Sequence, residues 1–141
     1  MPRKRRFLLV EDNDAHAKLI MLQFRDRADQ LLIDRVADGE QALEYLRNEG
    51  PYTGRERPDV VLLDLRLPRL DGHEVLRRLK ADEDLRRIPV IVLTTSQAEK
   101  DLAEAYREHA NSYLIKPFDF SRFQSMMEDV AHYWGDWNEH P

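Results

Sequence analysis

The chain has 141 residues, a length that suits one domain with its own hydrophobic core. Its formal net charge of −5 argues against general nucleic-acid binding, because contacts to phosphates require a basic surface. The absence of cysteine excludes disulfides and cysteine-bound metals, and no apolar run approaches the roughly 20 residues of a membrane span. The apolar stretch behind the basic residues 3–6 is too short for a signal sequence. We therefore expect a cytoplasmic protein with no nucleic-acid and no membrane partner.

Apolar, strand-like segments alternate with segments of helical periodicity along the chain. Strands are predicted at residues 7–10, 31–36, 60–63, 89–93 and 113–115. Helices are predicted to begin at Asn13 or Asp14, at Asp38, at Gly72, at Ala98, and at Asp119 or Ser121. The last helix is expected to end at Gly135, and residues 48–57 form a longer connection than such units usually need.

This alternation predicts an α/β fold, a doubly wound (βα)5 arrangement of the flavodoxin-like type. Its parallel sheet should have right-handed crossovers and the strand order 2-1-3-4-5. Residues 60–63 are apolar throughout, which is typical of a strand covered on both faces. In this strand order, Glu11, Asp12 and Asp64 meet at one crevice. Thr94 and Lys116 should lie on its flank.

Three carboxylates at one crevice would repel each other unless a cation shares them. Oxygen ligands without histidine or cysteine favour Mg²⁺. We interpret Asp64, at the end of a buried strand, as a nucleophile that accepts a phosphoryl group. Lys116 and Thr94 would then bind oxygens of that group. Each residue alone could be a helix cap, a strand-end residue or a surface charge, but their combination at successive strand ends indicates phosphoryl chemistry.

This combination resembles the receiver domain of two-component response regulators, over about residues 6–134. The resemblance rests on residues 10–13 (Val-Glu-Asp-Asn), 62–68 (Leu-Leu-Asp-Leu-Arg-Leu-Pro), 71–72 (Asp-Gly), 92–94 (Val-Leu-Thr) and 113–118 (Tyr-Leu-Ile-Lys-Pro-Phe). It implies that a sensor histidine kinase phosphorylates Asp64 in the presence of Mg²⁺. It also implies that a protein-interaction face switches in response.

The resemblance assigns roles to single residues. Glu11 and Asp12 would bind the metal together with Asp64, and the backbone carbonyl of Arg66 would be a further ligand. Many members of the family have aspartate in place of Glu11, whose longer side chain favours a water-mediated contact, so Asp12 is the better direct ligand. The peptide bond before Pro117 would be cis, an isomer that proline tolerates at small cost.

The switch implied by the resemblance consists of Thr94, which would swing toward the phosphoryl group, and Tyr113, which would turn inward behind it. The alternative for Tyr113 is a strand aromatic that only packs, and the sequence leaves both open. Arg66 and Ser96 each follow a site residue by two positions. Their side chains are expected to control the access of water to the aspartyl-phosphate.

Further features resemble single-domain regulators that are paired with phytochrome-type histidine kinases. They are the connection at residues 48–57, Thr95-Ser96, Ala110-Asn111 and the aromatic C-terminal end. We expect residues 1–141 to form one receiver domain, with a core of about 6–134, a C-terminal extension at 135–141 and no output domain.

Aromatic residues near the C-terminus suggest a contact surface. We predict a homodimer through the helix at 98–108, the strand at 113–115, the last helix and the tail. The candidate interface residues are Tyr106, Tyr133, Trp134 and Trp137. Alternatively, Trp134 completes the core and the others simply lie on the surface.

Three other functions share part of the pattern. A hydrolase of the haloacid dehalogenase type would need a second aspartate two positions after Asp64, where the chain has Arg66. A flavin-binding module would need a phosphate-binding loop where the acid pair lies. A phosphorylation-silent interaction domain would typically lack Asp64, Lys116 or the acid pair. The sequence therefore predicts a phosphoacceptor signalling protein rather than an enzyme, with at most slow Mg²⁺-dependent self-phosphorylation and self-dephosphorylation.

Overall fold

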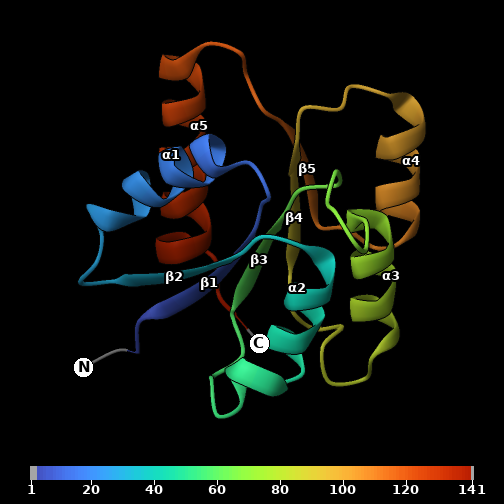
Figure 1. Ribbon diagram of the computed structural model, residues 1–141. Coiled ribbons are helices and arrows are strands. Elements are labelled where there is room, and N and C mark those ends of the chain that lie inside the picture. Colours follow the sequence, from blue (N-terminus) through green and yellow to red (C-terminus); the bar gives the residue numbers. More distant parts are fainter. Residues whose placement is uncertain (1–2, 141) are drawn as a thin grey trace.

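The computed structural model describes residues 3–140, which contain one parallel sheet of five strands (Figure 1). The strand order β2-β1-β3-β4-β5 confirms the predicted doubly wound α/β fold. The strands are β1 (Arg5–Val10), β2 (Leu31–Val36), β3 (Val60–Leu63), β4 (Val90–Thr94) and β5 (Ser112–Ile115). The α-helices are α1 (Asp14–Arg25), α2 (Gly39–Leu46), α3 (Gly72–Ala81), α4 (Glu99–Arg107) and α5 (Phe120–Ala131). A short 3₁₀ helix, Gly50–Tyr52, lies in the long connection before β3.

Helices cover both faces of the sheet, as Figure 1 shows. α1 and α5 lie on one face, where Met127 packs in a cluster with Leu62. α2, α3 and α4 lie on the other face, where Leu76 packs in a cluster with Leu63. Because both faces are covered, β3 is buried along its whole length. The sheet therefore carries Asp64, the residue that follows β3, into a buried position.

Side-chain caps start most of the helices where the sequence predicted them. Asn13, Asp38, Asp71 and Asp119 each accept a hydrogen bond from a backbone N–H in the first turn of the helix that follows. α4 differs, because Ala98 at its N-terminus has no side chain that can cap it. The start of α4 must therefore depend on contacts with other parts of the chain.

The predicted helix end at Gly135 is wrong. The backbone continues beyond α5 as a π-helical segment, His132–Trp137. A Cβ atom at position 135 would lie 2.6 Å from Cδ2 of Leu31, so the glycine lets this segment approach β2 closely. The glycine thus serves packing rather than helix termination. Along residues 3–140, no helix combines the length and the apolar character needed to cross a membrane.

Gly72, the first residue of α3, lies directly against the backbone that follows β3. Its N–H donates to the carbonyl oxygen of Leu65 over 2.9 Å. A Cβ atom at this position would lie 2.3 Å from the carbonyl oxygen of Asp64 and 2.6 Å from Cα of Leu65. Backbone atoms cannot rotate away as a side chain can. Glycine therefore allows α3 to begin beside Asp64 without displacing it.

We expect Gly72→Ala to lower the free energy of unfolding by about 1–3 kcal/mol, the range for overpacking a core. Helix propensity alone would favour alanine by up to about 1 kcal/mol, so the two effects have opposite signs. Chemical denaturation of both proteins measures the difference. A variant as stable as the parent would contradict the close approach of residue 72 to Asp64.

Candidate functional site

The C-terminal ends of the central strands lie side by side at one edge of the sheet. Val10 of β1 pairs with Leu63 of β3, and the amide nitrogen of Asp64 donates to the carbonyl oxygen of Val10 over 3.0 Å. Next to them, the amide nitrogen of Lys116 donates to the carbonyl oxygen of Thr94 over 2.8 Å. The register of the parallel sheet therefore brings the residues at the C-terminal ends of β1, β3, β4 and β5 to the same edge.

The ammonium group of Lys116 joins two of the predicted carboxylates. Its Nζ donates to Oε1 of Glu11 over 2.5 Å and to Oδ2 of Asp64 over 2.9 Å. Lys116, Glu11 and Asp64 are 4%, 1% and 7% exposed, so all three charged groups are buried. Buried charges are tolerated when they are paired in this way. The site is therefore a buried ion-pair system that three strands assemble.

Asp12 completes a cluster of oxygen ligands. One carboxylate oxygen from each of Glu11, Asp12 and Asp64 lies within 4.8 Å of the others. Asp12 is exposed whereas the other two are buried, so an ion bound here would face water on one side. An oxygen-only donor set with room for water fits Mg²⁺. The single Lys116 ammonium also leaves an excess of negative charge, which a divalent cation would neutralise.

Both oxygens of the Asp64 carboxylate accept hydrogen bonds. Oδ1 accepts from the backbone N–H of Arg66 over 3.1 Å, and Oδ2 accepts from Lys116. The carboxylate is thus held from two sides at the buried end of β3. The role of the Arg66 carbonyl as a metal ligand stays a prediction.

Thr94 and Tyr113 both contact the loop between β4 and α4. Thr94 is fully buried, and its Oγ1 accepts from the backbone N–H of Ser96 over 3.3 Å. Tyr113 is partly buried, and its hydroxyl donates to the carbonyl oxygen of Ser96 over 3.1 Å. Tyr113 therefore does more than pack, because its hydroxyl ties β5 to this loop. The switching roles of both residues stay predictions.

Sequence reasoning missed His16, a neighbour of Lys116. Nδ1 of His16 lies 3.0 Å from Nζ of Lys116. Burial and the nearby ammonium charge lower the pKa of His16, so its neutral ring is available to accept a hydrogen bond from Lys116. The sequence signal was weak: His16 lies in the first turn of the helix that follows the acid pair.

Sequence reasoning also missed Asp101. The helical periodicity of residues 98–108 predicts a thin apolar stripe of Leu102, Ala105 and Tyr106. Ala105 is buried as expected, but Leu102 and Tyr106 are 40% and 50% exposed, and the other buried residue of the helix is Asp101. Hydrogen bonds from Ser96 and His73 hold the pKa of Asp101 below its usual range. The spacing of Asp101 and Ala105, four positions apart, was the signal that could have identified this face.

The predicted cis peptide bond before Pro117 is wrong. None of the peptide bonds described between residues 3 and 140 is cis. The trans isomer is intrinsically favoured by about 0.5–1 kcal/mol even before proline. In this isomer the Lys116 amide still continues the ladder between β5 and β4, and its side chain reaches the site.

The predicted interface aromatics differ in their exposure. Tyr106, Tyr133 and Trp137 are 50%, 54% and 70% exposed. Trp134 is partly buried against the core between α1, α5 and the sheet, and its ring forms an edge contact with Tyr133. Trp134 therefore contributes to the core, whereas the other three rings are available at the surface.

The surroundings of Glu11 disfavour its charged form. Burial and the negative charge of Asp64 raise the pKa of Glu11 to about 7, although the hydrogen bond from Lys116 acts in the opposite direction. A carboxylate with so high a pKa exchanges its proton near neutral pH. Metal binding and protonation therefore compete at Glu11.

Residues 7–128 match the family model of the response regulator receiver domain. The chain belongs to this family, whose members are phosphoacceptor response regulators of two-component signalling. The match includes every residue of the acidic cluster together with Thr94 and Lys116. The fold and the family are thus those that the sequence predicted.

Individual relatives cover almost the whole chain. FilR2 of Methanothrix harundinacea, a probable methanogenesis regulatory protein, is 53% identical over 135 residues, which cover 95% of this chain and 86% of FilR2. The response regulator Rcp1 of Synechocystis is 40% identical over 129 residues, covering 90% of this chain and 86% of Rcp1. The crystal structure of phosphorylated RcpA, a cyanobacterial phytochrome response regulator, is similar with a TM-score of 0.95, 38% identity and 99% of both chains covered. These findings confirm the likeness to phytochrome-associated regulators.

A homologous receiver binds a metal in its site. The receiver domain of the sensor histidine kinase PA1611 from Pseudomonas aeruginosa was solved with magnesium coordinated in its active-site cleft. It is 33% identical, has a TM-score of 0.71, and the alignment covers 90% of this chain and 97% of that one. A divalent metal therefore agrees with both the family and the carboxylate cluster of this chain.

We expect the affinity for Mg²⁺ to fall about tenfold between pH 8 and pH 6, because the proton that Glu11 takes up near pH 7 competes with the metal. Calorimetric titration with MgCl₂ at both pH values measures the change. Glu11→Gln is the matched control, since it has no proton to exchange in this range and should lose the dependence. An equally steep pH dependence in this variant would refute the assignment to Glu11.

Proposed function

We propose that Asp64 accepts a phosphoryl group from a sensor histidine kinase and stores it as an aspartyl-phosphate. One observation carries the proposal: Asp64 is buried at a strand end, with Lys116 on one carboxylate oxygen and the Arg66 N–H on the other. Two further acids, Glu11 and Asp12, lie beside it. This is the set of groups that phosphoryl transfer requires, since that reaction depends mainly on positioning and on stabilisation of charge.

The chain supplies each part of the reaction. A carboxylate oxygen of Asp64 forms the new bond to phosphorus while the phosphorus–nitrogen bond of the donor histidine breaks, and the imidazole leaves. Lys116 exchanges its contact with the Asp64 carboxylate for one with a phosphoryl oxygen, and Thr94 donates its hydroxyl hydrogen to another. Mg²⁺, held by Glu11, Asp12, Asp64 and the Arg66 carbonyl, would neutralise negative charge on the transferred group.

The proposed role is signalling rather than turnover. A hydrolase would need a group that protonates or activates the reacting oxygen, and the position two residues after Asp64 holds Arg66 instead of a carboxylic acid. We therefore propose only slow, Mg²⁺-dependent self-phosphorylation and self-dephosphorylation. Thr94 and Tyr113 would report the phosphoryl group through Ser96, which both of them contact.

The proposed partner is a sensor histidine kinase. Similarity to RcpA, a cyanobacterial phytochrome response regulator, favours a phytochrome-type kinase. FilR2, with higher identity, is described as a regulator of methanogenesis. Both relatives agree with a sensor histidine kinase as the donor, and a phosphotransfer profile against candidate kinases identifies which one acts on Asp64.

We also propose a homodimer through α4, β5, α5 and the tail. β5 is an edge strand, and an apolar groove between β5 and α5 is lined by Leu114, Met126 and Tyr133. Arg122 and Asp129 also line this groove. A two-fold dimer brings the same surface of two copies together, so the opposite charges of these residues can pair across it.

Asp64→Asn should abolish phosphorylation by acetyl phosphate in the presence of Mg²⁺, because the amide is a poor nucleophile. Phosphate-affinity electrophoresis or intact-protein mass spectrometry measures the modified fraction. Asp29→Asn is the control, since Asp29 is exposed in the turn before β2, at the opposite end of the sheet. An unmodified parent protein, or modification that persists in Asp64→Asn, would refute the proposed acceptor.

In sedimentation velocity at micromolar concentration we expect a dimer that Tyr133→Ala weakens at least about tenfold, as for a central aromatic contact worth more than 1 kcal/mol. Leu22→Ala removes an exposed apolar side chain from α1, outside the proposed interface, and should leave the dimer unchanged. A monomeric mass with and without the phosphoryl mimic beryllofluoride would rule out the dimer.

A further inference from the structure

α4 buries few of its side chains against the rest of the domain. Its buried residues are Asp101 and Ala105, whereas its larger apolar side chains, Leu102 and Tyr106, are exposed. Its N-terminus has no side-chain cap. The helix therefore buries little apolar surface, and its position depends strongly on the one buried charged residue that it contains.

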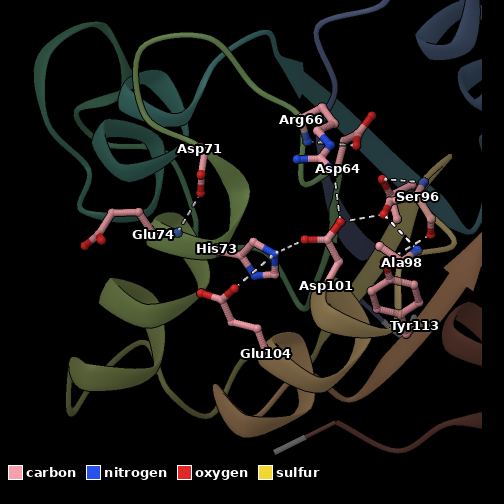
Figure 2. A network of polar contacts seen from close by, with 11 residues as sticks. Asp64, Arg66, Asp71, His73, Glu74, Ser96, Ala98, Asp101, Glu104 and Tyr113 are labelled. Carbon is pink, nitrogen blue, oxygen red and sulfur yellow. Dashed lines mark hydrogen bonds and ion pairs between the residues drawn. The ribbon is translucent and has the colours of Figure 1, made fainter.

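Asp101 accepts hydrogen bonds from three different segments (Figure 2). Oδ2 accepts from Nη2 of Arg66, in the loop after β3, over 2.9 Å, and from Oγ of Ser96, in the loop after β4, over 2.5 Å. Oδ1 lies 3.1 Å from Nε2 of His73 on α3. Asp101 is 8% exposed, so this carboxylate is a buried hub that joins α4 to both loops beside Asp64.

The hub is better explained as a structural connection than as a metal site. His73, Asp101 and Glu104 could each offer one ligand atom. However, Nδ1 of His73 is buried without a hydrogen-bond partner, whereas a metal-bound histidine usually donates its other N–H to an acceptor. The guanidinium of Arg66 already forms an ion pair with the Asp101 carboxylate, which a metal ion would have to displace. The contacts therefore favour a network that positions α4.

Arg66 connects this hub to the proposed phosphorylation site. Its backbone N–H donates to Asp64, while its guanidinium pairs with Asp101. The Arg66 side chain is 67% exposed, so the pair is screened by water and the guanidinium can be redirected at small cost. A phosphoryl group on Asp64 brings about −1.5 to −2 charges and three acceptor oxygens close to the same residue. Arginine binds such groups well because its planar fork donates to two oxygens at once.

We propose that Asp101 is a positioning residue that couples Asp64 to α4, because Asp101 and the phosphoryl group compete for the guanidinium of Arg66. The inference rests on the proposed function of Asp64. When Arg66 turns to the phosphoryl group, Asp101 keeps its contacts with Ser96 and His73 but loses its cation. The start of α4 and the loop before it then become less firmly held. Tyr113 senses the same loop, because it donates to the carbonyl oxygen of Ser96.

Coupling of this kind is reciprocal. If the phosphoryl group weakens the Arg66–Asp101 pair, then removal of the Asp101 charge must strengthen the binding of the phosphoryl group by the same free energy. We expect Asp101→Asn to bind beryllofluoride, in the presence of Mg²⁺, about two- to fivefold more tightly than the parent, since a pair whose arginine is largely exposed is worth up to about 1 kcal/mol. Amides of residues 99–107 should exchange hydrogen faster in the parent when beryllofluoride binds. In Asp101→Asn they should already exchange fast and respond little.

Two further variants test whether Asp101 couples α4 to Asp64 or only stabilises the helix. Glu99→Gln removes another acid from the first turn of α4, where it is exposed, and should keep the parental affinity and response. Arg66→Gln retains the backbone N–H to Asp64 and changes a largely exposed side chain, so it should fold normally. In this variant α4 should exchange faster without beryllofluoride and should not respond further when it binds.

The outcomes distinguish this inference from the proposed function. If Asp101→Asn and Arg66→Gln keep the parental affinity and the parental response of α4, Asp101 has only a structural role and the coupling is refuted. An increase in affinity for Glu99→Gln equal to that for Asp101→Asn would refute the specific role of Asp101. If the parent itself fails to bind beryllofluoride, the proposed function of Asp64 falls, and the inference falls with it.

Discussion

The rest of the site depends on the ammonium group of Lys116, which is held between the carboxylates of Glu11 and Asp64. Transfer of each charge from water into the interior costs several kcal/mol, and the mutual attraction offsets this cost only at bonding distance. The three residues follow three different strands, so the register of the sheet maintains the geometry. One ammonium cannot neutralise both carboxylates and Asp12, and the remaining negative charge is what a divalent cation would neutralise.

The surrounding fold combines a rigid part with a more weakly attached part. β3 is apolar on both faces and is covered by α1 and α5 on one side and by α2 and α3 on the other, so Asp64 lies at the end of a tightly packed strand. Gly72 brings α3 directly against the same strand end. α4, in contrast, buries only Asp101 and Ala105. When the charge at Asp64 changes, the end of β3 therefore stays in place. The polar contacts that hold α4 are the ones that can rearrange.

Much of this arrangement was predictable from local sequence patterns. Residues 60–63 are apolar throughout because both faces of the strand are covered, and Asp38 and Asp119 cap helices where their side chains can reach free N–H groups. The predictions from local patterns were wrong where a contact with a distant part of the chain decided the structure. Gly135 does not end a helix, because it accommodates Leu31 of β2. The buried face of α4 is rotated from the predicted apolar stripe, because Asp101 has polar partners on other segments of the chain.

The sequence by itself determined the strands, most of the helix starts and the identity of the acids, the hydroxyl and the lysine at the strand ends. Together with the strand order that βα repeats favour, this was sufficient to bring Glu11, Asp64 and Lys116 to one crevice. Only the tertiary structure decided which side chains meet there, including His16 beside Lys116 and Asp101 beside Arg66. The physical reason is distance along the chain: Lys116 lies 105 positions from Glu11 and 52 from Asp64, whereas helix and strand patterns extend over only a few residues. Pairs of this kind form only when the whole sheet has set its register.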